Sequence, residues 1–238
     1  MMEPLKKIAF LVPRPGMSDD DFLRHWQFVH GPLVAGSPGY ARWRLRYVQN
    51  HVRGPGPVGR RFGFAGMAEF LLPGHSPNED AFAQTSTYRD HIAPDERNFI
   101  DMERTVSMAA HEDTVLPGRA PAKVVVLSGR AKGVAADELH RRYRTEVVAK
   151  AMARPGFARR VRGWCVNHVI EGSFRLPGGR AVQELTVDLV EELWFASPDE
   201  AVAAFESAPL ACALLDGDSR QSFVAQEHVF FDEGQVVV

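Results

Sequence analysis

The chain has 238 residues, of which 45% are hydrophobic and 24% charged, which suffices for one large core or two small ones. The formal net charge is −2 and the 28 Lys and Arg residues form no long run, which argues against nucleic acid and membrane surfaces as partners. The apolar run Ile8–Val12 is too short for a signal peptide or a membrane span, so we expect a cytoplasmic protein. The two cysteines, Cys165 and Cys212, form no CxxC or zinc-type cluster, and no nucleotide motif is present. We therefore expect no metal and no cofactor.

The first predicted helix spans residues 18–35. Ser18 is a good N-cap and three aspartates follow it, where the helix dipole favours negative charge. At about 100° per residue, one apolar stripe contains Phe22, Trp26, Val29 and Leu33. His30 falls on the flank of that stripe, at the edge of the predicted buried surface.

A strand is predicted over residues 42–52, after a turn rich in Gly and Pro. Alternation places Trp43, Leu45, Tyr47, Gln49 and His51 on one face. A helix packed on this sheet could bring His51 to His30. A single histidine beside an apolar face is more often a structural residue, but the pairing favours a functional pair.

An internal repeat organises the chain. When Leu139 is aligned with Phe22, an offset of 117 residues, 32 residues align without a gap. Asn167-His168 then aligns with Asn50-His51. Both halves have the predicted order strand, helix, strand, strand, helix, strand, which is the ferredoxin-like βαββαβ unit. We therefore predict an α+β protein with modules at residues 1–113 and 122–238 and a linker at residues 114–121.

The elements follow the same order in each module. In the first we predict strands over 7–12, 42–52, 63–72 and 104–110, with helices over 18–35 and 76–91. In the second we predict strands over 122–127, 158–169, 185–195 and 226–231, with helices over 135–152 and 198–215.

The first half resembles the EthD family of dimeric α/β barrels. The resemblance rests on the opening strand, Arg14-Pro15-Gly16-Met17-Ser18, the Phe22 to His30 helix, the Tyr47 to Val52 strand, Glu69-Phe70 and Asp95-Glu96. The second half resembles the family more weakly. Since relatives usually carry one module and close a barrel by dimerising, the tandem implies an intramolecular barrel, and it leaves open a homodimer of such barrels.

The two halves differ in residues that could perform chemistry. Val147 stands at the position of His30, whereas Glu146 replaces Val29 and is predicted to fall in the apolar stripe of its helix. There it would either bind an arginine, acquire a raised pKa or, if the helix is rotated, lie in solvent. The other candidate substrate contacts are Trp26, Trp43, Tyr47, Glu69, Tyr88, Asp95 and His168. Glu69 has a counterpart in Glu192, which favours a structural role, and Asp95 follows a proline at a predicted helix end, where aspartates usually cap.

Relatives include cofactor-free dehydratases and decarboxylases, and the wider superfamily includes cofactor-independent monooxygenases. The resemblance thus implies a lyase that acts on a small aromatic or polyketide-like molecule. His30 would be the general acid/base and His51 would polarise a carbonyl or orient the substrate. A monooxygenase of a phenolic substrate and a non-catalytic binding protein remain as alternatives.

Overall fold

The computed structural model describes residues 4–74, 80–173, 187–232 and 235–236. Eight antiparallel strands form a closed barrel in the order β9, β2, β4, β1, β5, β7, β8, β6 and back to β9, while β3 and β10 pair with β9 at its rim. The strands are β1 (Leu5–Leu11), β2 (Arg46–Pro55), β3 (Arg60–Arg61), β4 (Gly66–Leu72), β5 (Val106–Leu116), β6 (Ala122–Arg130), β7 (Val161–Val169), β8 (Leu189–Phe195), β9 (Leu215–Asp232) and β10 (Gln235–Val236).

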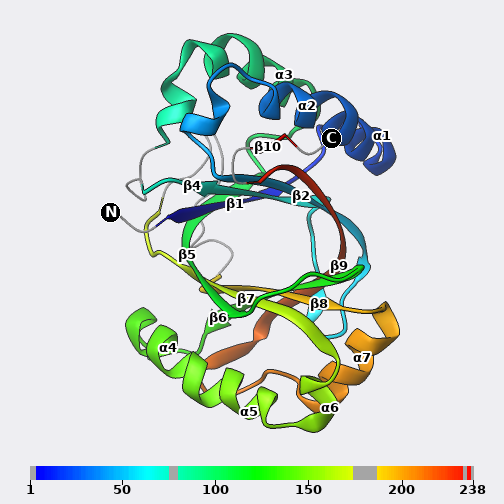
Figure 1. The fold of residues 1–238 in the computed structure, drawn as a ribbon, viewed down its shortest axis with the longest axis vertical. Coiled ribbons are helices and arrows are strands. Elements are labelled where there is room, and N and C mark those ends of the chain that lie inside the picture. Colours follow the sequence, from blue (N-terminus) through cyan, green and yellow to red (C-terminus); the bar gives the residue numbers. More distant parts are fainter. Residues whose placement is uncertain (1–3, 75–79, 174–186, 233–234, 237–238) are drawn as a thin grey trace.

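Helices cover the barrel on two opposite sides (Figure 1). On one side lie α1 (Asp19–His25), α2 (Gly31–Ala35) and α3 (Ala93–Phe99), and on the other lie α4 (Ala136–Tyr143), α5 (Ala149–Met152), α6 (Pro155–Ala158) and α7 (Pro198–Ser207). Turns of π-helix at Trp26–His30, Tyr88–Ile92 and Arg144–Val148 interrupt three helices, and short 3₁₀ turns lie at Tyr40–Arg42 and Ala81–Gln84. In the described part of the chain, no helix is long and apolar enough to cross a membrane.

The predicted fold class is confirmed. Each half contributes four barrel strands and two helical segments in the order βαββαβ, and the halves meet along two seams, β2 with β9 and β5 with β7. The eight-stranded barrel therefore closes within one chain. The predicted boundary needs one change, because β5 continues to Leu116 and only residues 117–121 connect the modules.

Several other predicted elements differ at their ends, and three of the differences have a clear local cause. The strand predicted from Arg42 begins at Arg46, because a 3₁₀ turn precedes it. The second helix was predicted over 76–91; residues 76–79 lie outside the described part, and the helical segment continues to Phe99 through a π turn that accommodates Pro94. The helix predicted to reach Leu215 ends at Ser207, and Leu215 instead opens β9.

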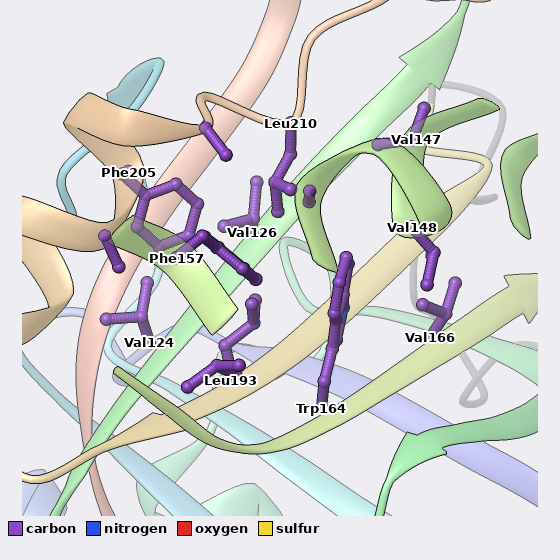
Figure 2. Packing of buried hydrophobic residues seen from close by; sticks show 14 of the residues in the cluster. Val124, Val126, Val147, Val148, Phe157, Trp164, Val166, Leu193, Phe205 and Leu210 are labelled. Carbon is purple, nitrogen blue, oxygen red and sulfur yellow. The ribbon is translucent and has the colours of Figure 1, made fainter. Parts of the chain in front are cut away.

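Alternation along β1 separates two environments. Lys6, Ile8 and Phe10 point into the barrel, whereas Lys7, Ala9 and Leu11 face the helices. Apolar side chains therefore fill one end of the barrel interior, and charged side chains occupy the other. On the helix side of the second module, Phe157, Trp164 and their neighbours pack into a continuous core (Figure 2).

Candidate functional site

A cavity lies between the sheet and the helices of the first module. Its walls come from β1, β2, β4, the helix that contains His30 and the helical segment 88–100. Trp26, Tyr47 and Phe70 supply aromatic surface, and His30, Tyr88 and Glu96 supply polar groups. The free space is about 40 Å³, enough for a few water molecules but less than an aromatic ring needs. A ring-sized ligand therefore enters only if lining side chains move.

The π turn at Trp26–His30 places His30 in this cavity. One extra residue in the turn rotates the following helix by about one position, or roughly 100°. As a result His30 and Val34 are 4% and 3% exposed, whereas Val29 and Leu33 are 49% and 37% exposed. The predicted apolar stripe is thus wrong for residues after Trp26. His30 lies on the buried face of the helix and not on the flank of that face.

Asp95 is the partner of His30. Its two carboxylate oxygens lie 2.8 Å from His30 Nδ1 and 2.8 Å from His25 Nε2, so one carboxylate bridges two imidazoles on the neighbouring helix. Burial would raise the pKa of Asp95, but the hydrogen bonds and charge of His30 and His25 outweigh burial and lower that pKa. Asp95 is therefore an ionised acceptor and does not cap a helix end.

This bridge fixes the tautomer of His30. An ionised carboxylate can only accept, so Nδ1 carries the hydrogen that binds Asp95 and Nε2 of the neutral ring carries a lone pair. No described residue forms a hydrogen bond with Nε2, and the ring lines the cavity. His30 is therefore arranged as a base with an orienting carboxylate behind it, as in other histidine-dependent sites.

Two further sets of hydrogen-bonded polar side chains border the cavity. Tyr88 donates its hydroxyl hydrogen to Glu96 Oε2 at 2.6 Å, and burial and the neighbouring Glu96 raise the pKa of Tyr88. At another wall, Asp80 accepts from Arg44 through both oxygens at 2.7 Å and from Lys7 at 2.8 Å. Burial would raise the pKa of Asp80, but these two cations hold it well below its usual range.

His51 does not meet His30. Its ring stacks on Trp26 with centroids 4.9 Å apart, lies 4.4 Å from His228 and is absent from the cavity wall. Burial and the nearby His228 and Arg53 lower the pKa of His51 to about 3, so the imidazole is neutral near pH 7. The predicted histidine pair is therefore wrong as a contact, because Trp26 takes the place of His30 against His51.

The structure separates the other predicted contacts. Trp26, Tyr47 and Tyr88 line the cavity, whereas Trp43 is partly buried behind it, beside Tyr40 and Phe82. In the second module, the π turn leaves Glu146 in solvent, where it accepts from Arg142 at 2.6 Å. Of the alternatives for Glu146, the structure therefore has the rotated helix with an arginine partner, and Arg142 holds the pKa of Glu146 below the usual range. His168 lies 4.6 Å from His140, remote from the cavity, and burial lowers its pKa to about 4.

Glu69 points into the barrel. With Glu192 it binds Lys6 and Lys123: Lys6 Nζ lies 2.7 Å from Glu69 and contacts Glu192, and Lys123 Nζ lies 3.0 and 2.7 Å from the same two residues. Asn50 and Asn167 each donate to the carboxylate of their own module. This arrangement repeats between the modules and supports the structural role expected for the repeated carboxylate.

Glu112, Cys165 and Glu192 form a group of possible metal ligands inside the barrel. Their candidate atoms lie within 4.8 Å of one another, but the Lys6 ammonium contacts both carboxylates and provides the positive charge that a metal would supply. Burial also raises the pKa of Cys165, which keeps the thiol protonated. These residues therefore fit a bound ammonium better than a metal ion.

Sequence reasoning did not single out Lys7, Arg44 and Asp80 and assigned no role to Glu96 or Gln49. The local sequence gives no sign that Lys7 and Arg44 are buried, because only the packing of the segment 81–100 over β1 and β4 buries them. Asp95 and Glu96 were visible as an acidic pair after a proline. The extension of the helix beyond that proline, which the periodicity did not show, brings Glu96 to the cavity wall and Asp95 to His30 and His25.

The family model described as the EthD domain matches residues 14–103, which contain the π turn, the His30 and Asp95 pair and strands β2 and β4. The first module therefore matches the EthD domain over most of its length. No curated protein matches the chain. The second module has the same order of elements and lies outside the matched residues.

Several solved structures share the fold over nearly the whole chain. A candidate monooxygenase from Lactobacillus acidophilus NCFM is 12% identical, with a TM-score of 0.56 and coverage of 99% of each chain. An anthrone oxidase-like protein is 10% identical, with a TM-score of 0.57 and coverage of 99% of this chain and 96% of that one. A candidate chlorite dismutase is 11% identical, with a TM-score of 0.54 and coverage of 95% and 96%. At these identities the likeness shows the barrel fold of the EthD-containing chain and nothing about its reaction.

Proposed function

We propose that this EthD protein is an enzyme that uses His30 to remove and return a proton on a small aromatic or polyketide-like substrate. The observation that carries the proposal is the Asp95 carboxylate on His30 Nδ1, which leaves Nε2 as a base in a cavity with aromatic walls. Such a pair needs no other group for proton transfer. The protein's own side chains therefore supply the chemistry.

The leading reaction is a lyase reaction, a dehydration or a decarboxylation. In a dehydration, His30 Nε2 takes a proton from the carbon next to a carbonyl, and the electron pair of that C–H bond first forms the enolate. The enolate then expels hydroxide from the neighbouring carbon, and the imidazolium returns its proton to the leaving oxygen, so that water is the second product. Asp95 stabilises the imidazolium that exists between the two transfers.

A cofactor-independent monooxygenase is the second candidate, and the names of two neighbours in fold favour it. His30 would deprotonate an electron-rich phenol, and O₂ would then accept electrons from the anion. One oxygen atom would enter the product and the other would leave as water. Both candidates use the same base and differ only in what reacts with the anion.

One experiment separates the two reactions. Hydroxylated aromatic ketones and anthrone-type phenols are offered to the purified protein under argon and under ¹⁸O₂, and products are identified by mass spectrometry. A lyase forms product under argon with no ¹⁸O, whereas a monooxygenase needs oxygen and incorporates one ¹⁸O atom. Turnover that survives His30→Ala would refute the proposal in both forms. His168→Ala is the matched control, because His168 is the counterpart of His51 in the second module and does not line the cavity.

A further inference from the structure

Tyr47 is held rigidly at the wall of the same cavity. It lies on β2, is fully buried, and its ring stacks between Phe70 at 4.7 Å and Phe230 at 5.4 Å between centroids. Two flanking rings prevent the phenol from swinging, so the direction of its hydroxyl group is set by the backbone. The position of this oxygen is therefore a fixed property of the cavity.

Gln49 shows which hydrogen bond the Tyr47 oxygen makes. The Gln49 Nε2 atom lies 2.8 Å from the carbonyl oxygen of Trp26, which can only accept, so that atom must be the amide nitrogen. The opposite amide oxygen then faces His51 Nε2 at 3.0 Å and accepts from it. The second hydrogen of Nε2 points at Tyr47 Oη, also at 2.8 Å. Tyr47 consequently accepts from Gln49 and cannot donate back to it.

The hydroxyl hydrogen of Tyr47 therefore has no acceptor among the described residues, although the side chain is buried and lines the cavity. We infer that Tyr47 donates this hydrogen bond to an oxygen of the substrate, and that the site selects aromatic compounds with a carbonyl or phenolic oxygen beside the acidic proton. The inference rests on the proposed function, because it uses the same cavity and adds a recognised group on the ligand.

This donor fits the chemistry of His30. When His30 removes a proton next to a carbonyl, negative charge develops on the carbonyl oxygen, and a fixed donor there stabilises the transition state more than the ground state. Burial raises the pKa of Tyr47 more than the hydrogen bonds from Gln49 and Trp26 lower it, so the phenol keeps its hydrogen at neutral pH. Gln49 is a positioning residue, because it acts on the substrate only through Tyr47.

Two probes of nearly equal shape test the inference. Acetophenone has a carbonyl oxygen where α-methylstyrene has a methylene group, so their difference in affinity reports on a hydrogen bond to that position. Binding of both is measured by calorimetry or ligand-observed NMR to the wild type, Tyr47→Phe and Tyr40→Phe. Tyr40 is the matched control, because its buried hydroxyl lies outside the cavity wall and also lacks a partner among the described residues.

We expect Tyr47→Phe to lower the affinity for acetophenone by about five- to ten-fold, which is the effect of one neutral hydrogen bond. The affinity for α-methylstyrene should change by less than about two-fold. Tyr40→Phe should leave the ratio of the two affinities unchanged. Should Tyr47→Phe fail to fold, the carbonyl stretching frequency of acetophenone bound to the wild type replaces it. A shift to lower frequency relative to an apolar solvent supports the inference, and an unshifted band overturns it.

The possible failures can be distinguished. If both probes bind the wild type and Tyr47→Phe leaves the ratio of their affinities unchanged, Tyr47 is not a donor to the ligand. Only this inference is then refuted. If neither probe binds the wild type, the cavity does not take aromatic molecules, and the proposed function falls together with the inference.

Discussion

The two modules share a backbone plan and differ in what lies between helix and sheet. Both have a π turn in the first helix, Trp26–His30 in one and Arg144–Val148 in the other. In the first module the space beneath it is a cavity, and in the second it is filled, with Trp164 at the position of Tyr47 and Phe157 beside it (Figure 2). Side-chain volume at a few aligned positions thus decides whether this interface is a pocket or a core.

The barrel interior shows the opposite behaviour. Lys6 and Lys123, Glu69 and Glu192, and Asn50 and Asn167 occupy equivalent places and make equivalent contacts. Each ammonium binds the carboxylate of its own module and also that of the other module, so separating the modules would remove part of the partners of every charge. The interior therefore joins the modules, while the helix side is free to differ between them.

The largest expected effect tests the helix side. His30→Ala should lower kcat/KM by roughly 10²-fold to 10⁴-fold, because the proton transfer loses its base. The measurement is steady-state turnover of whichever substrate the ¹⁸O₂ experiment identifies, with thermal unfolding as a check on folding. His51→Ala should cost less, because Trp26 separates that ring from the cavity wall.

Changes in the second module provide the controls. His168→Ala and Glu146→Gln should leave turnover nearly intact, because neither side chain lines the cavity. Near wild-type activity of His30→Ala combined with loss of activity in either control would reverse the assignment. The second module would then be the active one.

The next effect concerns the shared interior. Lys6→Met should lower the free energy of unfolding by about 3–5 kcal/mol, because it leaves Glu69, Glu112 and Glu192 without one of their cations. Lys123→Met should cost a similar amount if the two modules are equivalent here. Urea unfolding measures both, and the exposed Lys132→Met serves as the control, with an expected change within about 0.5 kcal/mol. A large difference between the two lysines would show that the interior is as asymmetric as the helix side.

A smaller effect comes from Glu191, which stands where the first module has Ala68. It is fully buried on the helix side and accepts from Trp164 Nε1 at 3.2 Å. Burial raises its pKa from 4.5 to about 7, so the folded state holds a proton that the unfolded state releases above pH 4.5. The contribution of Glu191 to the free energy of unfolding is therefore fully present below about pH 4.5. It is lost as the pH rises through 7, and the total loss is roughly 3 kcal/mol.

Glu191→Gln should remove this loss. The difference in unfolding free energy between wild type and variant should shift in favour of the variant from pH 5 to pH 8, as measured by urea unfolding at each pH. A difference independent of pH would contradict the prediction, because it would mean that Glu191 does not titrate in the folded state between pH 5 and pH 8. Gln preserves the shape of the side chain, so packing contributes equally at both pH values.

The fold could be predicted from the sequence because it depends on patterns that survive tertiary packing. The repeat, the period of the strands and the Ser18 cap, whose hydroxyl accepts from the Asp21 amide at 3.1 Å, all have local causes. Of the site, the sequence indicated His30, Tyr47, Tyr88 and Asp95 individually. It paired His30 with the wrong residue, because a period of 3.6 residues cannot reveal a π turn.

The missed groups share a physical reason. Arg44 and Lys7 are buried because Asp80 accepts from both, and Asp80 reaches them across 36 and 73 residues of chain. A single sequence gives no signal for an ion pair of that separation. In the same way, the donor role of Tyr47 depends on the amide orientation of Gln49, which follows from the Trp26 carbonyl on the neighbouring helix.

For the removal of metal ions we expect no effect at all. Prolonged dialysis against a chelator should leave turnover and acetophenone binding unchanged, because the proposed chemistry uses only His30, Asp95 and Tyr47. The clustered ligand atoms of Glu112, Cys165 and Glu192 already surround the Lys6 ammonium, and a divalent ion there would have to displace it against charge repulsion. Loss of activity restored by one divalent ion would contradict this. If Cys165→Ser then abolished the restoration, the shared barrel interior would be the functional centre and the helix side would not.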